Sequence, residues 1–122
     1  MRVYVCHSKD LDYRETLYRP VRERFADSRH EIIFPYELCD IPKDSLGVIR
    51  SCDLMVAEVS FPSTGLGIEI GWAHMLDKPI VCIHAEGTKI SGSLRIVTDR
   101  IHEYRDEKSL VDLFERLLFS VA

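Results

Sequence analysis

The chain has 122 residues, which is enough for a single domain spanning 1–122 and too few for two. Hydrophobic residues make up 46% of it and charged residues 30%, the profile of a globular protein that buries a core. The formal net charge of −4 argues against a nucleic acid polymer as partner, although a local basic pocket for one phosphate is compatible with it.

The first residues, MRVYVC, lead directly into a strand-like run, without the charged, apolar and small-residue regions of a signal peptide. No apolar run reaches the length that a membrane helix needs. These observations predict a cytoplasmic protein that does not associate with a membrane. The four cysteines, at positions 6, 39, 52 and 82, lack the spacing of zinc sites, and we expect no metal and no other cofactor.

The first third of the chain alternates apolar runs with an amphipathic segment. Continuous apolar runs at 3–6 and 32–34 are typical of buried strands. Between them, three apolar residues at four-residue spacing predict one face of a helix: Leu17, Val21 and Phe25. Pro20 falls inside this pattern, so the helix either bends there or begins there.

The middle of the chain continues the alternation. A short helix is predicted over 43–52, with Leu46 and Ile49 directed inward. The run at 54–59 is the strongest candidate for a central strand. After a loop rich in serine, proline and glycine, a helix is predicted from about 66 to 76.

The last third predicts two more strands and a terminal helix. The fully apolar run at 80–83 is a strand, 94–97 is an element of uncertain type, and 101–104 is a weaker final strand. A helix over 107–120 has an apolar face made of five residues: Leu110, Leu113, Phe114, Leu117 and Leu118.

Buried strands that alternate with amphipathic helices predict an α/β fold, with a five-stranded parallel sheet covered by helices on both faces. Right-handed crossovers favour the doubly wound, flavodoxin-like or Rossmann-like strand order 2-1-3-4-5. In such a sheet the ligand lies beyond the carboxyl ends of the strands, at the switch point between strands 1 and 3. The loops at 7–13 and 60–66 are therefore expected to form the binding site.

The segment SFPSTGLG, at 60–67, has the composition of a ligand-binding loop. Gly65 and Gly67 allow close approach of the backbone, the hydroxyl groups add donors, and the amides of the following helix favour an anion. The segment contains neither the GK[ST] of a phosphate-binding Walker loop nor a GxGxxG pattern. A plain turn between strand and helix is the alternative interpretation.

Glu69 is the leading candidate for chemistry. It is expected in the first turn of the helix, among apolar residues, which suits a nucleophile or base kept ionised by the helix start. The alternative is a surface carboxylate that complements the helix dipole. Tyr4, on the first strand, either reaches a carboxylate at the switch point or is a core aromatic, and Glu58 is more simply a strand-end residue capped by a neighbouring loop.

The segment VAEVSFPSTGLGIEIGWA, together with VYVCHS and KPIVCIH, resembles the nucleoside 2-deoxyribosyltransferase superfamily, and most closely its branch of 2′-deoxynucleoside 5′-phosphate N-hydrolases. The resemblance covers most of the chain and implies the same five-stranded fold, in a homodimer or a larger homo-oligomer. It implies that Glu69 attacks or stabilises C1′ of the sugar and that Tyr4 orients this glutamate.

The resemblance also implies substrate-binding residues. Ser63 matches a serine that holds the 5′-phosphate, and Ser8 lies in the loop that lines the same phosphate site. Ser93 matches a serine that a neighbouring subunit lends to the site, with Ser91 as the alternative. Asp44 is the nearest match to an aspartate that protonates the leaving base, although it lies one residue out of register.

The chain departs from the family pattern at three positions near this site. Ser45 occupies the register position of the protonating aspartate. His7 stands where the family usually has glycine, and a side chain there is expected to narrow the pocket. Asp10 adds a negative charge that would repel a phosphate.

These features lead to the hypothesis of an N-glycosidase that cleaves the base–sugar bond of a (2′-deoxy)nucleoside 5′-monophosphate. The alternatives are a nucleoside 2-deoxyribosyltransferase that exchanges bases and a non-catalytic nucleotide-binding module. A flavodoxin-like response domain is disfavoured, since the third strand does not end in the acidic phosphoacceptor that such domains need.

Overall fold

The computed structural model describes residues 1–38 and 44–121, with side chains up to residue 119. Its five strands form one sheet in the order β2-β1-β3-β4-β5, and every neighbouring pair is parallel. The strands are β1 (Arg2–His7), β2 (Glu31–Ile33), β3 (Leu54–Glu58), β4 (Ile80–Ala85) and β5 (Ile101–Tyr104). The predicted fold class and strand order are confirmed.

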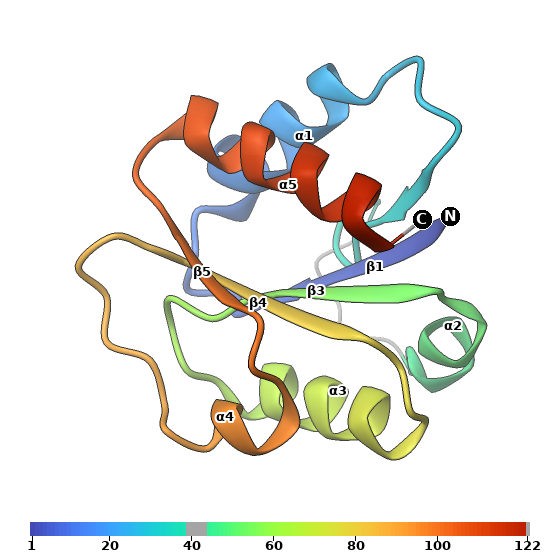
Figure 1. The fold of residues 1–122 in the computed structure, drawn as a ribbon, viewed down its shortest axis with the longest axis vertical. Coiled ribbons are helices and arrows are strands. Elements are labelled where there is room, and N and C mark those ends of the chain that lie inside the picture. The colour runs from blue at the N-terminus through green and yellow to red at the C-terminus, as the bar shows by residue number, and fades with distance from the viewer. Residues whose placement is uncertain (39–43, 122) are drawn as a thin grey trace.

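The helical elements cover the sheet on both faces (Figure 1). They are η1 (Arg14–Tyr18), α1 (Arg19–Arg24), α2 (Leu46–Ser51), α3 (Thr64–Met75), α4 (Leu94–Val97) and α5 (Glu107–Val121). In the view of Figure 1, α1 and α5 lie on one side of the sheet, and α2, α3 and α4 lie on the other. The element of uncertain type at 94–97 is therefore a short helix.

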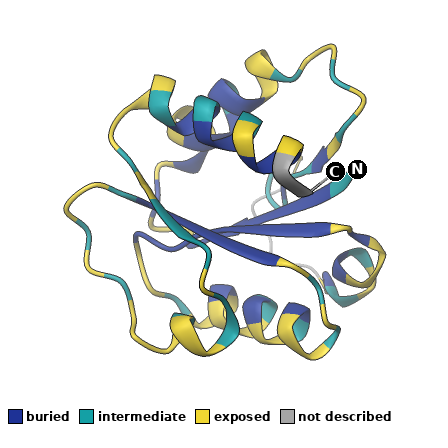
Figure 2. Ribbon diagram, viewed as in Figure 1, coloured by how far each residue is buried: buried dark blue, intermediate teal, exposed yellow. Residues whose placement is uncertain are grey.

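The core has two halves, one on each face of the sheet. Along β1, Val3 and Val5 pack toward α1 and α5, whereas Tyr4 and Cys6 pack toward α2 and α3. The central strands are buried on both faces, as Figure 2 shows, which explains why their sequences are continuous apolar runs rather than alternating ones. The predicted apolar face of α5 is buried as expected.

The first helical segment continues through Pro20. A π-helical turn over Arg14–Tyr18 runs directly into α1, with the Arg19 amide bonded to the Arg14 carbonyl. Pro20 lies in the first turn of α1, where its missing amide hydrogen costs little. The prediction that a helix begins near Pro20 fits the start of α1, and a π-helical turn precedes it.

Two helix starts differ from the prediction because a side chain caps each one. The helix predicted over 43–52 is α2, from Leu46; Asp44 Oδ1 accepts a hydrogen bond from the Leu46 amide at 3.1 Å, and residue 43 lies outside the described residues. Ile49 is buried there, whereas Leu46 is only half-buried. The next helix, α3, begins at Thr64 rather than at 66, since Ser63 Oγ accepts from the Leu66 amide at 3.3 Å.

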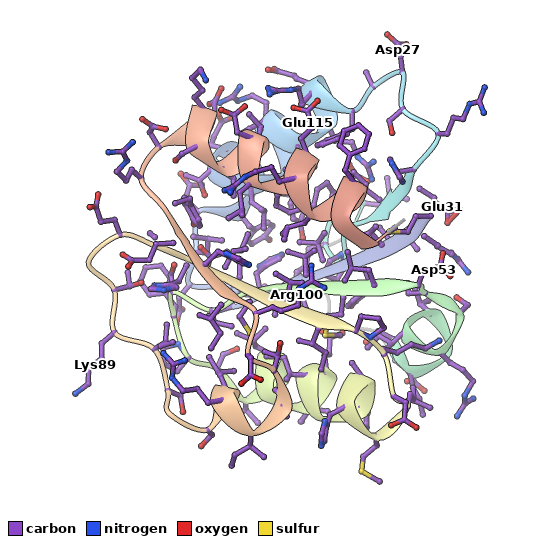
Figure 3. All side chains as sticks on the ribbon, viewed as in Figure 1. Asp27, Glu31, Asp53, Lys89, Arg100 and Glu115 are labelled. Carbon is purple, nitrogen blue, oxygen red and sulfur yellow. The ribbon has the colours of Figure 1, made fainter. Side chains whose placement is uncertain are left out.

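Charged side chains line the outside of the molecule, as the sticks in Figure 3 show for Asp27, Glu31 and Lys89. Three cysteines, at 6, 52 and 82, are free thiols buried in the protein, and Cys39 lies outside the described residues. Within the described part of the chain, no group of three His, Cys, Asp or Glu side chains is placed to hold a metal ion. No helix in that part is long and apolar enough to cross a membrane.

The burial of α5 predicts a sharp difference between its two phenylalanines. Phe114 is fully buried and Phe119 is 75% exposed. We expect Phe114→Ala to lower the free energy of unfolding by about 3–5 kcal/mol through the cavity it leaves. Phe119→Ala, the matched control, should change it by less than about 0.5 kcal/mol. Urea denaturation followed by circular dichroism measures both, and equal effects would contradict the packing described.

Candidate active site

A cavity of about 400 Å³ lies at the carboxyl ends of β1 and β3, where the topology predicts a ligand site. The loop after β1, the residue before α2 and the first turns of α3 form its walls. Four of the residues predicted for the site line it: Ser8, Ser63, Gly65 and Glu69. His7 and Asp10 line it too, as does Trp72 of α3.

Glu69 is held by two hydroxyl groups. Tyr4 Oη donates to Glu69 Oε2 at 2.5 Å, across 65 positions of sequence. Ser45 Oγ donates to the same oxygen. The carboxylate is half-buried, whereas Tyr4 is 1% exposed and Ser45 is 9% exposed, so both donors are rigidly placed beneath it.

The position of Glu69 corrects one prediction. Because Ser63 caps α3, Glu69 lies in the second turn of the helix and not in the first, which contains no acidic residue. The amides at the helix start therefore point to the region of Ser63 rather than to Glu69. The negative charge of Glu69 is compensated by the hydroxyl groups of Tyr4 and Ser45 instead.

Tyr4 is a permanent donor. Burial and, second, the charge of Glu69 raise the pKa of its phenol well above the usual range. The phenol therefore stays protonated at neutral pH and donates its hydrogen bond to Glu69. The contact between Tyr4 and Glu69 that the family resemblance implies is present.

Ser45, rather than Asp44, reaches the carboxylate. Ser45 is the N-cap residue of α2, yet its hydroxyl makes no capping bond. Asp44 is exposed and caps the helix instead, through the Leu46 amide. Ser45 occupies the position of the family's protonating aspartate, but its contact with Glu69 was not predicted from the sequence. That position in the family pattern was the signal from which the contact could have been predicted.

The opposite end of the cavity suits an anion. Ser63 is half-buried at the N-terminus of α3, beside the first-turn amides of that helix. Ser8 is buried, and its Oγ accepts from the Asp10 amide at 3.1 Å. Lys9 and Asp10 are exposed at the rim, with the Lys9 ammonium 5.1 Å from the centre of the Tyr36 ring. The rim therefore carries one charge of each sign.

His7 forms part of the wall as a neutral side chain. Its Nδ1 lies 2.8 Å from the Ser8 carbonyl oxygen, so Nδ1 is the nitrogen that must carry the proton. Its Nε2 then accepts from the Tyr18 hydroxyl at 2.5 Å, and that hydroxyl accepts from the Tyr36 amide at 3.2 Å. Burial lowers the pKa of His7, partly opposed by the Ser8 carbonyl. The imidazole therefore fills space without adding charge.

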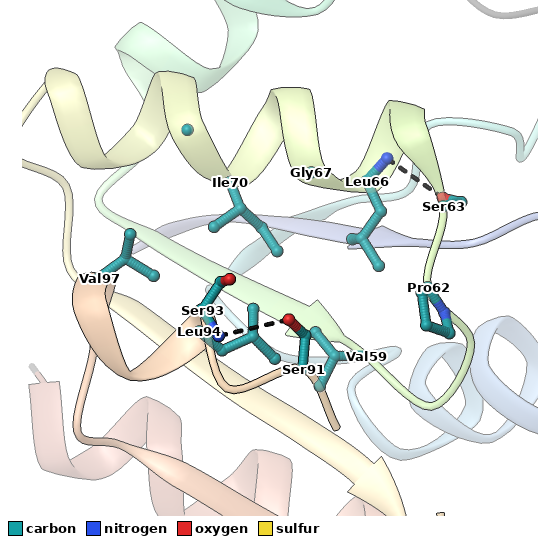
Figure 4. A pocket seen from close by; sticks show the side chains of 11 residues that line it. Val59, Pro62, Ser63, Leu66, Gly67, Ile70, Ser91, Ser93, Leu94 and Val97 are labelled. Atoms are coloured by element: carbon teal, nitrogen blue, oxygen red, sulfur yellow. Dashed lines mark hydrogen bonds between the residues drawn. The ribbon is translucent and has the colours of Figure 1, made fainter. Parts of the chain in front are cut away.

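Three other predicted residues lie on the far side of α3. Gly67, Ser93 and Ser91 line a second cavity of about 310 Å³, between α3 and the segment that carries α4 (Figure 4). Ser63 and Leu66 border both cavities, so the first turn of α3 separates them. Within one chain, Ser93 does not reach the cavity of Glu69.

Glu58 belongs to the framework of the site. It is 1% exposed and accepts from the Ser60 amide at 2.7 Å, from Ser60 Oγ at 2.8 Å and from the Tyr104 hydroxyl. Ser60 Oγ also accepts from the Ala85 amide at 2.8 Å. The interpretation of Glu58 as a strand-end residue capped by the neighbouring loop is confirmed.

Comparison with curated proteins supports the resemblance found in the sequence. No model of a known protein family matches the chain. The putative 2′-deoxynucleoside 5′-phosphate N-hydrolase 1 of Methanosarcina mazei is 32% identical over 71 residues, 56% of this chain and 44% of the relative. The 5-hydroxymethyl-dUMP N-hydrolase of Mus musculus is 35% identical over 74 residues, 56% of this chain and 43% of the relative. The matched part is therefore less than half of either relative.

Solved structures support the fold over nearly the whole chain. The CMP N-glycosidase BcmB of Clostridium botulinum superimposes with a TM-score of 0.62 at 24% identity, over 94% of this chain and 99% of the other. A 2-deoxyribosyltransferase of Bacillus psychrosaccharolyticus gives 0.57 at 17% identity, over 92% and 91%. The likeness to the two N-hydrolases confirms the resemblance that the sequence indicated, and the solved structures confirm the fold.

The neutral state of His7 predicts how stability depends on pH. Its pKa is lowered in the folded protein, so the unfolded chain binds the proton more readily, and stability falls as the pH drops below the unfolded value near 6.5. The loss is at most about 1.4 kcal/mol per pH unit. Urea denaturation at pH 7.5 and pH 5 measures it. In His7→Gln the difference between the two pH values should shrink; an unchanged difference would assign the effect to other groups.

Proposed function

We propose that the protein is an N-glycosidase that hydrolyses the base–sugar bond of a (2′-deoxy)nucleoside 5′-monophosphate. The observation that carries the proposal is the geometry of Glu69, whose Oε2 accepts from both Tyr4 and Ser45 at the wall of the cavity. A carboxylate fixed through one oxygen presents the other to a reacting atom. Its relatives among N-hydrolases support the same reaction class.

The reaction needs an anion beneath C1′. As the C1′–N bond lengthens, the sugar gains positive charge like that of a glycoside in a retaining glycosidase. Glu69 Oε1 stabilises this charge or forms a bond to C1′, and the electron pair of the broken bond goes to the base. Water then adds to C1′ and loses one proton, and Glu69 is again a free carboxylate. The departed base takes up one proton, so the protons balance. Asp44 as the proton donor to the base stays a prediction.

The 5′-phosphate is assigned to the end of the cavity at Ser63 and Ser8. The first-turn amides of α3 provide donors there, and the helix dipole favours the negative charge. A Cβ atom built on Gly65 meets nothing within 4 Å, so the absent side chain leaves open space on the phosphate side of the helix. In this proposal the phosphate lies at the start of α3, and C1′ lies about one turn further along the helix, at Glu69.

Transfer of the sugar to a second base is the alternative, favoured by the structural likeness to a 2-deoxyribosyltransferase. Both reactions share the intermediate at Glu69 and differ in what enters the cavity next. Incubating the protein with the common ribo- and deoxyribonucleoside 5′-monophosphates, with and without an added free base, separates them. Free base released equally in both conditions supports hydrolysis. Binding of nucleotides without any released base would support a non-catalytic module.

We also propose a homodimer or larger homo-oligomer in which Ser93 completes the site of a neighbouring subunit. Exposed apolar side chains support this: Ile68 and Met75 on α3, and Ile96 on α4. A helix that is apolar all round is normally covered on both sides. Ser93 is exposed, so it is available to a partner.

Removing the carboxylate charge should abolish the reaction. We expect Glu69→Gln to lower kcat on the order of 10³-fold or more, because the amide can neither bond to C1′ nor stabilise positive charge there. Tyr4→Phe should lower kcat on the order of tenfold with little change in KM. Release of free base followed by chromatography measures both. Full activity of Glu69→Gln would exclude the proposed role.

Mixing two inactive variants tests the shared site. Glu69→Gln and Ser93→Ala each damage a different part of the proposed composite site. In random mixed dimers one site of each heterodimer is intact, so about a quarter of the activity should return. Each variant incubated alone is the control. A Ser93→Ala variant with normal activity, or a mixture that stays as inactive as Glu69→Gln, would contradict the shared site.

A further inference from the structure

Ser45, the N-cap residue just before α2, has a side chain that is directed unusually for its position. A serine at an N-cap normally turns its hydroxyl onto the amides of its own helix. Here Asp44 Oδ1 takes the Leu46 amide, and the Ser45 hydroxyl donates to Glu69 Oε2. The buried Ser45 is thereby held by its backbone, since its carbonyl accepts the Ile49 amide at 2.9 Å. The start of helix α2 therefore holds a neutral hydrogen-bond donor, the Ser45 hydroxyl, in contact with the Glu69 carboxylate.

The pair of donors on Glu69 has a chemical consequence. Glycosidases usually use two carboxyl groups, one as nucleophile and one as acid for the leaving group. Both contacts of Glu69 described here are hydroxyl groups, and both protons are directed at Oε2. A serine hydroxyl is too weak an acid to protonate a base, and burial keeps the Tyr4 phenol neutral.

Among the residues that the structure describes, the other titratable groups near the cavity are also poorly suited to act as that acid. The Nδ1 proton of the neutral His7 is bound to the Ser8 carbonyl, and its Nε2 accepts from the Tyr18 hydroxyl. Burial and, second, the charge of Glu69 raise the pKa of the Tyr36 phenol, which makes it a weaker acid. Asp44 faces the Leu46 amide and does not line the cavity, and Lys9 and Asp10 lie at its exposed rim.

We propose that Ser45 is a positioning residue that fixes Glu69 through Oε2, and that the base leaves this site as an anion rather than as a base protonated by a carboxylic acid. The inference rests on the proposed function. In the step, the C1′–N bond breaks and its electron pair stays on the base nitrogen, while Glu69 Oε1 supplies the pair that stabilises or bonds C1′. Water later adds to C1′, its proton goes to solvent, and the base anion takes a proton from solvent.

This chemistry selects the class of substrate. A pyrimidine-2,4-dione such as uracil spreads the negative charge of the departing nitrogen over two carbonyl groups. A purine leaves readily only after protonation of its ring. We therefore expect nucleotides of uracil-type bases to be hydrolysed faster than adenine or guanine nucleotides. Electron-withdrawing groups on the pyrimidine ring should increase the rate further.

A series of 2′-deoxyuridine 5′-monophosphates with methyl, hydrogen, bromine or fluorine at C5, together with dAMP and dGMP, tests the inference directly. We expect kcat to rise by at least about tenfold from the methyl to the fluorine substituent, because no proton transfer offsets the charge on the base. A flat series, or faster hydrolysis of the purine nucleotides, would overturn it. If no nucleotide releases a base, the proposed function itself fails, and this inference fails with it.

Variants test the part played by Ser45. We expect Ser45→Ala to lower kcat about tenfold or more, with little change in KM and with the dependence on the C5 substituent preserved. Ser51→Ala is the matched control, since it removes an exposed hydroxyl at the other end of α2 that donates to the Val48 carbonyl at 2.8 Å. Equal kcat for Ser45→Ala and Ser51→Ala would overturn the positioning role.

Carboxyl variants test the absence of an acid. Ser45→Asp introduces an acid beside Glu69, and we expect it to raise the rate ratio of dAMP to 5-fluoro-dUMP, whatever its effect on the absolute rates. Asp44→Asn keeps an acceptor for the Leu46 amide and Asp10→Asn keeps the shape of the rim. A loss of kcat of about 100-fold or more in either variant would identify a carboxylic acid that protonates the base, and would overturn the inference.

Discussion

The contact of Tyr4 and Ser45 with one oxygen of Glu69 connects three separate parts of the fold. Tyr4 comes from the first strand, Ser45 from the start of α2, and Glu69 from the second turn of α3. A half-buried carboxylate in apolar surroundings needs donors. These hydrogen bonds from β1 and from the start of α2 hold the first two turns of α3 at the carboxyl ends of the strands. The cavity, the anion end at Ser63 and the direction of Glu69 Oε1 all depend on that placement.

Much of this arrangement could be predicted from the sequence, because the strands are buried on both faces. Continuous apolar runs identified four of the five strands, and 101–104 was predicted as a weaker fifth. The crossover rules then gave the order that brings the ends of β1 and β3 together. The family resemblance paired Tyr4 with Glu69, residues 65 positions apart that no local pattern relates. The long-range part of the site was predictable because topology determines it.

The details that sequence reasoning missed are local competitions between side chains for backbone groups. Ser63 and Asp44 are each able to cap a helix one or two residues away, and the winner decides where the helix starts. Because Ser63 caps α3, Glu69 lies in the second turn of the helix and not in the predicted first turn. Because Asp44 caps α2, the hydroxyl of Ser45 is available to Glu69. The π-helical turn before Pro20, whose Leu17 and Tyr18 are buried, was not predicted either, because helical spacing alone does not distinguish a π-turn from an α-turn.

The hydrogen bonds of Glu58 have a consequence for the order in which the protein is assembled. Tyr4 and Ser45, the two hydroxyl donors to Glu69, precede it in the sequence. The loop that leads to Ser63, in contrast, is tied through Ser60 to the Ala85 amide and through Glu58 to the Tyr104 hydroxyl, which are 25 and 46 positions further on. A chain synthesised only as far as the end of α3 therefore contains both hydroxyl donors to Glu69 but lacks the contacts that hold the loop before Ser63. The wall of the cavity at Ser63 thus depends on β4 and β5, which come later in the sequence.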